Sequence, residues 1–399
     1  MLQRIWQAYQ VTGRVFRAWL SPLLTLFLFL NLRMSVAVGM LVDPFLFSRL
    51  RQTRIERPIV IVGNPRTGTT FLHRFLVEQR LGAGMELWRM LYPSLSLQTL
   101  LRPLMPLLER LSPTRHHAAA AHHTSLTAVE TDDAALLFRY FDGFFLYGFL
   151  MAWADQDRYA DFDPAHRDTS ARDFAWLRAI WRRNLVATGG SRVIAKLFSI
   201  GPRLPQFLAR FPDARILYLV RDPVAAIPSA MSLVTGVLDS RFGFWNRPPA
   251  LRHRYLDRLY RAFVELLQRF HDACQSGAID RSRVLIVPYE RLMSDFEALM
   301  AEILAFLDVQ PTPALLAAIA READTQRRYK SEHHYDLARF GLDAEQIRRD
   351  CAFVYASFLN SRSTVIQTVS LRPMEAKDRV HDNARLHPRG VLEAEHGGH

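Results

Sequence analysis

Residues 58–70 constrain the fold more than any other part of the chain. The run PIVIV at 58–62 is continuously apolar and predicts a buried strand. From Gly63 the chain then reads G-x-x-x-x-G-T-T and enters a helical pattern over residues 69–80. This order of strand, glycine loop and helix is that of the phosphate-binding P-loop, except that Thr69 takes the place of the usual lysine. We therefore expect the backbone N–H groups at the helix start to bind an anion.

Three further apolar runs predict strands: residues 192–197, 214–220 and 283–288, each followed by a helical stretch. Buried strands that alternate with helices indicate a parallel sheet with crossover helices. Residues 86–112 and 130–188 predict additional helices. The expected fold is therefore α/β, a P-loop-like three-layer fold with a central parallel sheet, helical insertions and an N-terminal helical anchor.

Composition and patterning divide the chain into three parts. Of its 399 residues, 49% are hydrophobic and 23% charged, so a large core is feasible. We expect an amphipathic, membrane-associated helical segment at 1–56, the α/β domain at 57–369, and a polar, loose tail at 370–399.

The first 50 residues combine basic and apolar patterns. Residues 1–20 are basic with apolar residues at helical spacing, although Thr12 and Gly13 interrupt the stripe. Two apolar runs follow on either side of Arg33, and each is shorter than the 18–20 residues or so that span a bilayer. Residues 1–50 are thus interpreted as an interfacial amphipathic anchor or as helices docked on the body, with one true span at 21–47 as the remaining alternative. The expected location is the cytoplasmic face of a membrane, or the cytoplasm.

The charge of the chain is strongly biased. The formal net charge of +12 favours anionic partners such as nucleotides or an acidic membrane surface. No nucleic-acid-binding motif is recognised, so we expect no nucleic acid partner. Of the 51 basic residues only Lys196, Lys330 and Lys377 are lysines. A lysine retained against this bias indicates a position that requires a compact ammonium group.

The sequence predicts neither a disulfide framework nor a metal site. The two cysteines, Cys274 and Cys351, form no C-x-x-C pair. The paired histidines of residues 116–123 have no carboxylate or cysteine at ligand spacing.

A second anion site is predicted after the strand at 214–220. Arg221 follows this strand directly, and Asp222 and Pro223 suit the N-cap and first position of a helix. Ser229 lies eight residues after Arg221, about two helical turns on. Because ligands of open α/β sheets bind beyond the carboxyl ends of the strands, Arg221 and Ser229 can share one phosphate.

These motifs together resemble those of the sulfotransferase family. The loop at 63–70 resembles its 5′-phosphosulfate loop, and Arg221 with Ser229 resembles its 3′-phosphate motif. Residues 283–309 are similar to its segment of strand, Tyr-Glu-x-Leu and helix. Residues 327–343 are similar to the C-terminal segment of a bacterial branch related to the protein-tyrosine sulfotransferases.

The resemblance, which covers about residues 57–355, implies 3′-phosphoadenosine-5′-phosphosulfate (PAPS) as co-substrate and no metal. A transferred sulfuryl group carries less charge than a γ-phosphate, which accounts for the missing lysine. The resemblance assigns the 5′ side of the nucleotide to Arg66, Thr67, Gly68, Thr69 and Thr70, and the 3′-phosphate to Arg221 and Ser229. It also suggests that Tyr289 lines the nucleotide and Lys330 reaches its phosphates. Arg66 and Lys196 are the expected catalytic cations, although Lys196 is followed by Leu-Phe where the family has Ser-Pro or Asp-Pro.

A general base must accept the proton of the acceptor hydroxyl. Glu86 lies 21 residues after Pro65, near the spacing of the glutamate base in the protein-tyrosine branch. A closer bacterial pattern reads Leu-Trp-Glu-Met-Leu, but this chain has Arg89 in place of that glutamate. Glu86 is therefore the first candidate for the base, with His123 and Glu130 as alternatives.

Three functions remain open on the sequence alone. The first is a PAPS-dependent sulfotransferase acting on an unidentified acceptor alcohol, and the aromatic-rich residues 138–153 hint at a hydrophobic one. The second is a kinase or NTPase with a degenerate P-loop. The third is a non-catalytic, membrane-associated nucleotide-binding protein.

Overall fold

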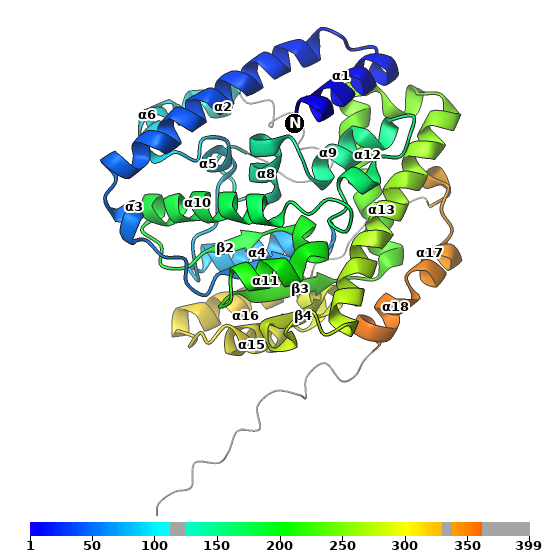
Figure 1. The fold of residues 1–399 in the computed structure, drawn as a ribbon. Helices are drawn as coiled ribbons and strands as arrows, with labels where there is room; N and C mark the ends of the chain where they lie inside the picture. The colour runs from blue at the N-terminus through cyan, green and yellow to red at the C-terminus, as the bar shows by residue number, and fades with distance from the viewer. Residues whose placement is uncertain (112–124, 329–336, 361–399) are drawn as a thin grey trace, which may run out of the picture. The chain divides into compact units, whose positions relative to one another are not determined.

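The computed structural model describes residues 1–111, 125–328 and 337–360, and its centre is one parallel sheet (Figure 1). The sheet has four strands in the order β2-β1-β3-β4. They are β1 (Ile59–Val62), β2 (Ile194–Lys196), β3 (Arg215–Val220) and β4 (Val284–Pro288). Each strand lies within one of the four apolar runs, which confirms the expected parallel sheet.

Alternation along β1 shows why the fold has three layers. Val60 and Val62 pack into one hydrophobic cluster, whereas Ile59 and Ile61 pack into a second cluster on the opposite face. All four side chains are fully buried. A strand buried on both faces requires helices on both sides, and the α/β three-layer expectation is confirmed.

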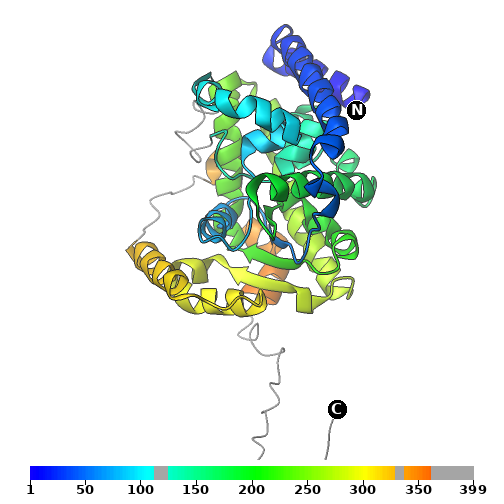
Figure 2. The same ribbon diagram turned by 90° about the vertical axis from the view of Figure 1, so that its left-hand side faces the viewer.

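Two sets of helices cover the two faces of the sheet (Figures 1 and 2). The face of Val60 packs against α10 (Ser170–Thr188), α11 (Leu204–Arg210), α12 (Pro223–Phe242) and α13 (Pro249–Gln275). The face of Ile59 packs against α4 (Thr69–Glu78), α14 (Tyr289–Ser294), α15 (Phe296–Phe306) and α16 (Pro313–Arg328).

The insertions are helical, as expected. After α4 come α5 (Leu87–Leu91), α6 (Leu95–Leu101), the 3₁₀ turn η1 (Arg102–Leu104) and α7 (Met105–Leu111). The chain continues with α8 (Asp133–Tyr140) and α9 (Phe144–Phe149), and η5 (Phe198–Arg203) follows β2. The described chain ends with α17 (Ala344–Asp350), α18 (Ala352–Val354) and the π-helical turn η9 (Tyr355–Leu359). Pro103 lies in η1, where its missing N–H and fixed φ separate α6 from α7.

The N-terminal segment forms α1 (Leu2–Phe16), α2 (Ser21–Leu46) and the short α3 (Arg49–Gln52). The two apolar runs form one helix: α2 continues through Arg33, whose guanidinium lies 5.7 Å from the ring centroid of Phe29. Thr12 and Gly13 likewise lie inside α1. A single arginine does not stop a helix of good helix formers, because its stem lies along the helix surface.

Both N-terminal helices pack on the body. The ring of Phe16 stacks on Phe242 with centroids 4.4 Å apart and meets Trp153 edge-on.

By length and composition, α2 and α12 are the described helices that could cross a membrane, with 11% and 50% of their most apolar windows buried. The domain boundary at residue 56 and the tail at 370–399 stay predictions, and the tail lies outside the described residues.

A buried carboxylate ties the second half of α2 to the body. Asp43 is 0% exposed, and its Oδ2 lies 2.6 Å from Nε of Arg183 on α10. Asp43 also accepts hydrogen bonds from the Ser94 hydroxyl and the Leu95 N–H at the start of α6. Arg183 in turn donates to the backbone oxygen of Met40. One carboxylate therefore joins three helices that lie far apart in the sequence.

Candidate functional site

The glycine loop leaves β1 in a conformation that requires its glycines. Gly63 has φ +146°, and a Cβ there would lie 2.4 Å from the backbone oxygen of Leu219. Gly68 has φ +89°, and a Cβ there would lie 3.0 Å from the ring of Tyr289. Arg66 also has a positive φ, 73°. The loop thus curls tightly against β3 and α14, as a backbone cradle for an anion does.

Side chains inside the loop fix its shape. The Thr67 hydroxyl donates to the backbone oxygen of Asn64 at 2.8 Å, and the Asn64 amide donates to the backbone oxygen of Phe263 at 3.0 Å. Thr67 and Asn64 are both buried. Gly68 is the N-cap of α4, so the first N–H groups of this ten-residue helix lie at the carboxyl end of β1. They provide the positive end of a helix dipole for an anion.

The loop opens on a hollow of about 270 Å³. Its lining comes from the carboxyl ends of β1, β3 and β4 and from α16: Arg66, Gly68, Thr69, Thr70, Phe71, Arg221, Tyr289, Met293 and Gln326. In the strand order, the connection from β1 runs to β2 on one side and then crosses to β3 on the other. The hollow therefore lies at the switch point where α/β sheets bind ligands.

The two predicted anion motifs meet at this hollow. The Arg66 guanidinium donates through Nε to the Ser229 hydroxyl at 2.9 Å. Arg221 donates through Nη1 to the backbone oxygen of Arg66 at 3.0 Å, and its guanidinium lies 4.2 Å from the ring centroid of Tyr289. The aromatic face orients the cation. Two arginines and a buried serine thus form one continuous basic rim.

Lys196 reaches the same loop from the end of β2. Its Nζ donates to the Thr70 hydroxyl at 3.0 Å and lies 4.0 Å from Oε2 of Glu130. The side chain is buried, and burial lowers the pKa of Lys196, while the Glu130 carboxylate acts in the opposite direction. Glu130 is held in turn by Arg74, whose Nη2 lies 3.0 Å from its Oε1.

The two residues after Glu130 clasp the backbone of Lys196. The Thr131 hydroxyl and the Asp132 N–H both donate to the backbone oxygen of Lys196, at 3.0 and 2.8 Å. The Asp132 carboxylate accepts the Lys196 N–H at 3.1 Å and the indole N–H of Trp181 at 2.8 Å. Burial raises the pKa of Asp132 to about 7, although both hydrogen bonds oppose the shift. This clasp fixes Lys196 and Glu130 relative to each other.

Glu86 lies in a different environment from Glu130. It is the N-cap residue of α5, and its carboxylate accepts hydrogen bonds from the Trp88 indole at 2.8 Å and from Nε of Arg89 at 2.7 Å. The arginine that replaces the family glutamate therefore pairs with Glu86. The structure places Glu130 beside Lys196 instead. The other candidates His123 and Lys330 lie outside the described residues.

Two residues of the site were not singled out from the sequence. Arg74 lies four residues after Thr70, on the same face of α4, and this spacing is a signal that could have found it. Asp132 belongs to the polar run Glu-Thr-Asp-Asp at 130–133. Such a run next to predicted helices is a weaker indication of a functional site.

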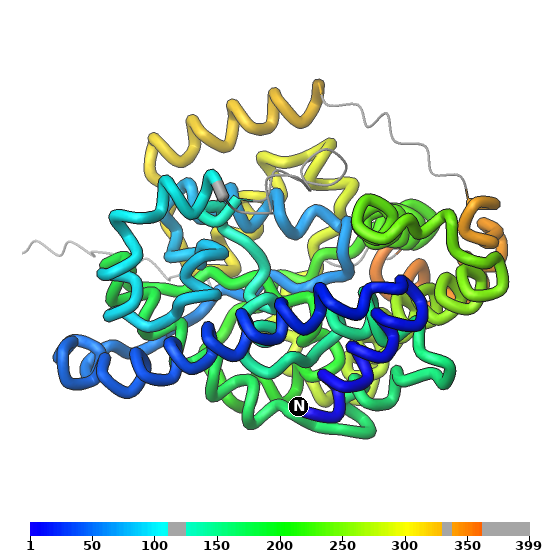
Figure 3. Tube along the Cα trace, turned by 90° about the horizontal axis from the view of Figure 1, so that it is seen from above, coloured from blue at the N-terminus to red at the C-terminus, as the bar shows by residue number. Residues whose placement is uncertain are grey.

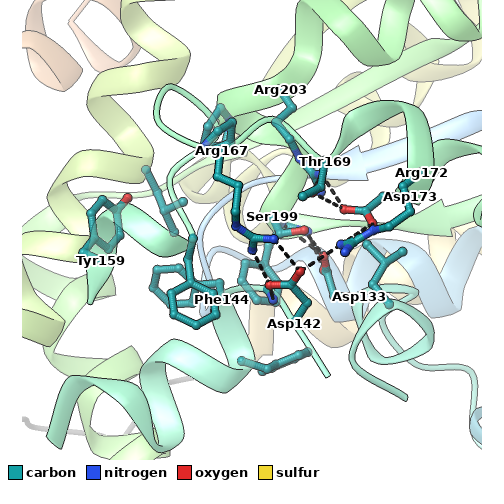
Figure 4. Close-up of a pocket in the computed structure, with 18 residues that line it drawn as sticks. Asp133, Asp142, Phe144, Tyr159, Arg167, Thr169, Arg172, Asp173, Ser199 and Arg203 are labelled. Atoms are coloured by element: carbon teal, nitrogen blue, oxygen red, sulfur yellow. Dashed lines mark hydrogen bonds and ion pairs between the residues drawn. The ribbon is translucent and has the colours of Figure 1, made fainter. Parts of the chain in front are cut away.

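A smaller polar pocket of about 50 Å³ lies beyond the strand end that carries Lys196 (Figure 4). In Figure 4, Arg167 and Arg172 both approach Asp142, and Arg203 approaches Asp173. These three arginines share the carboxylates of Asp142 and Asp173, so the pocket is lined by an ion-pair network. It supports the η5 turn that follows Lys196.

Metal ligands do not cluster in the described part of the chain: residues 1–111, 125–328 and 337–360 hold no group of three His, Cys, Asp or Glu suited to a metal ion. Cys274 and Cys351 are both buried, and neither is in a disulfide.

Comparison with known proteins identifies relatives by sequence and by fold. The model of the sulfotransferase family matches residues 58–313. The crystal structure of sulfotransferase STF1 from Mycobacterium tuberculosis H37Rv has a TM-score of 0.68 and 20% identity, covering 88% of this chain and 90% of that chain. Sulfotransferase STF9 from Mycobacterium avium has a TM-score of 0.61 and 19% identity, covering 78% and 79%. A search of curated proteins gives no match. At these identities the likeness to the two structures concerns the fold.

Proposed function

Because the chain belongs to the sulfotransferase family, we propose that it transfers a sulfuryl group from PAPS to the hydroxyl group of an acceptor by in-line displacement. Membership of this family supports sulfuryl transfer in general. The choice of donor rests on the hollow at the glycine loop, and the assignment of a base rests on the contacts of Lys196.

The residues of the hollow suit a nucleotide with phosphate groups on both its 5′ and 3′ sides. The loop N–H groups with Thr69 and Thr70 would hold the 5′ side, and Arg221 with Ser229 would hold the 3′-phosphate. Arg66 spans the two groups through its bond to Ser229. Tyr289 offers a ring face beside Arg221. When bound, PAPS supplies an electrophilic sulfur on a leaving phosphate oxygen.

Binding to this hollow is expected without a divalent metal, because arginines and N–H groups supply the positive charge. Isothermal titration of 3′-phosphoadenosine-5′-phosphate (PAP) in EDTA tests this expectation. Strictly magnesium-dependent binding would contradict it and would favour the NTPase alternative.

The acceptor side of the mechanism rests on three side chains in a row. Thr70, Lys196 and Glu130 are joined at 3.0 and 4.0 Å. Glu130 would accept the proton of the attacking hydroxyl, and Arg74 holds the carboxylate in place. The Lys196 ammonium would stabilise negative charge that develops on the bridging oxygen. The contacts of Lys196 with Thr70 and Glu130 are the main observation behind the proposal, and they favour Glu130 over Glu86 as the base.

Matched substitutions of the two glutamates test the assignment. Sulfate transfer is measured with ³⁵S-labelled PAPS against a panel of sterols, glycolipids and 4-nitrophenol. Glu130→Gln should lower kcat by about 10²–10⁴-fold, the usual contribution of a general base. Glu86→Gln should change kcat by less than about threefold, and both variants should keep their affinity for PAP. The reverse ranking would assign the base to Glu86.

The alternative functions are decided by the same assay. A kinase or NTPase, which membership of the sulfotransferase family disfavours, would need magnesium for nucleotide binding and would transfer no label. A non-catalytic nucleotide-binding protein would bind PAP and transfer no label to any acceptor. We infer a hydrophobic alcohol as acceptor and a position at the cytoplasmic face of a membrane, because the exposed apolar surface of α1 and α2 would bring the enzyme to lipid.

A further inference from the structure

Exposed apolar side chains are concentrated in two segments of the described chain. Of its twenty exposed large hydrophobic residues, sixteen lie in residues 1–46 and three in residues 100–107. The last is Leu316 on α16. The three in the second segment are Leu100, Leu104 and Leu107, which are 67%, 48% and 54% exposed. The exposed apolar side chains are therefore clustered, and exposed apolar clusters of this kind mark interaction surfaces.

The two segments form one surface. Helix α2 packs beside α6, and the Asp43 carboxylate binds the start of α6 directly. Figures 1 and 2 both show α6 next to α2, and Figure 3 shows α1 and α2 side by side. Leu100 lies on α6, and Leu104 and Leu107 lie on the η1 and α7 segments that follow it, so we infer that they continue the apolar surface of α2. We call the exposed apolar surface of α1, α2, α6, η1 and α7 the lipid face.

A hollow of about 620 Å³ opens in the lipid face between α1 and the first half of α2. Nearly all of its lining is apolar, including Leu2, Trp6, Leu26 and Phe29. Such an apolar surface is unfavourable in water. Ends of lipid acyl chains can fill the hollow, which removes this contact with water.

Positive charges predominate in the N-terminal part of the lipid face. Residues 1–55 contain seven arginines and one acidic residue, Asp43. Asp43 is fully buried and paired with Arg183, so it adds no surface charge. The arginines at the ends of α2, Arg17 and Arg49, are exposed. Acidic side chains also lie nearby: Asp155, 3.9 Å from Arg14, and Glu109 on α7. Exposed apolar residues with an excess of cations complement an anionic membrane surface.

The contacts of α2 determine how it can lie in a membrane. At 26 residues it is about 39 Å long, enough to cross a bilayer. One side of α2, however, is committed to the body by the ion pair of Asp43 and Arg183. At Gly39 the approach is so close that a Cβ would lie 2.3 Å from the Ser94 hydroxyl. A spanning α2 would drag these polar groups into hydrocarbon, which is costly.

We propose that the lipid face lies in one leaflet of an anionic bilayer, with α2 parallel to the membrane plane and α6, η1 and α7 contributing a second point of insertion. Two points of insertion from separate segments hold the body in one orientation on the membrane. This inference does not depend on the reaction that the enzyme catalyses.

Environment-sensitive labels at single cysteines test the proposal, because both native cysteines are buried. The labelled variants of α2 are Leu24→Cys, Met34→Cys and Phe45→Cys, and Leu107→Cys reports on α7. All four should shift to the blue with vesicles of phosphatidylcholine and 30% phosphatidylglycerol. Leu316→Cys, an exposed leucine outside the lipid face, is the matched control and should not shift.

Depth-dependent quenching by lipids with nitroxides separates the possible orientations. The proposal expects the three α2 labels to lie at similar, shallow depth. A deep label at position 34 between shallow labels at 24 and 45 would show a spanning helix and overturn the parallel orientation. A silent label at position 107 would overturn the contribution of α7.

Charge insertion gives an independent measurement. Leu104→Glu with Leu107→Glu should weaken vesicle binding at least tenfold, while Leu316→Glu should leave it unchanged. Affinity for PAP confirms that the variants are folded. Full-length protein that does not sediment with anionic vesicles at low salt would refute the lipid face altogether.

Discussion

Substituting Arg221 by alanine separates its contact with a 3′-phosphate from its structural contacts. Arg221 makes one hydrogen bond to Arg66 and one ring contact to Tyr289, and both exist whatever the ligand carries at its 3′ position. Their loss should weaken any nucleotide by about 0.5–1.5 kcal/mol. A charge-assisted bond to phosphate contributes a further 1.5–3 kcal/mol or so, but only to a ligand with a 3′-phosphate.

Isothermal titration of the Arg221→Ala variant with PAP and with adenosine 5′-monophosphate measures both contributions. The affinity for PAP should fall by roughly 10–150-fold more than the affinity for the monophosphate. Arg215→Ala is the matched control, because Arg215 lies at the opposite end of the same strand and pairs with Asp308. It should change neither affinity by more than about twofold. Equal losses for the two ligands in Arg221→Ala would refute the assignment of the 3′-phosphate to this arginine.

Three further predictions concern the core of the site and its supports. Lys196→Arg should lower kcat with little effect on PAP affinity. A guanidinium keeps the charge but lacks the compact ammonium that fits between Thr70 and Glu130. A kcat within twofold of the natural enzyme would exclude a catalytic role that requires lysine. Burial lowers the pKa of His73 to about 3, so the unfolded chain takes up the proton first as pH falls below about 6.5. In urea unfolding, the loss of stability between pH 6.5 and 4.5 should be about 2.3 kcal/mol smaller for His73→Gln than for the natural chain, and an equal loss would contradict this. Asp43→Ala leaves Arg183 buried without its carboxylate and should destabilise the fold by about 3–5 kcal/mol, most of it recovered by adding Arg183→Met; equal stability of the single and double variants would contradict this.

The sheet was predictable from the sequence because its strands are buried on both faces. Residues 58–62 are apolar without interruption, residues 214–220 are interrupted only by Arg215 at the strand start, and no amphipathic alternation obscures either run. The glycine loop was equally clear, since Gly63 and Gly68 have positive φ angles that other residues rarely adopt. The continuity of α2 was not predictable, because it depends on how Arg33 lies against the helix and on the body beneath it.

The carboxylate of the candidate site was harder to predict, because its position depends on tertiary contacts. Glu86 and Glu130 are 44 residues apart, but their segments meet where Glu86 bridges Val129. Spacing from the loop favoured Glu86. In the structure Arg89 pairs with Glu86, and Glu130 is the carboxylate next to Lys196, which is why we propose Glu130 as the base.

The proposed membrane contact and the proposed base lie on connected parts of the structure. Helix α7, whose Leu107 belongs to the lipid face, carries Glu109, and the Glu109 carboxylate accepts the Leu126 N–H at 2.9 Å. Leu126 packs with Trp88 and Met105 in a small separate core, four residues before Glu130. A leaflet that contacts α7 is therefore linked through a few residues to the segment that holds the carboxylate beside Lys196. This connection between the proposed membrane contact and the proposed base is why lipid alcohols are the acceptors to test before water-soluble ones.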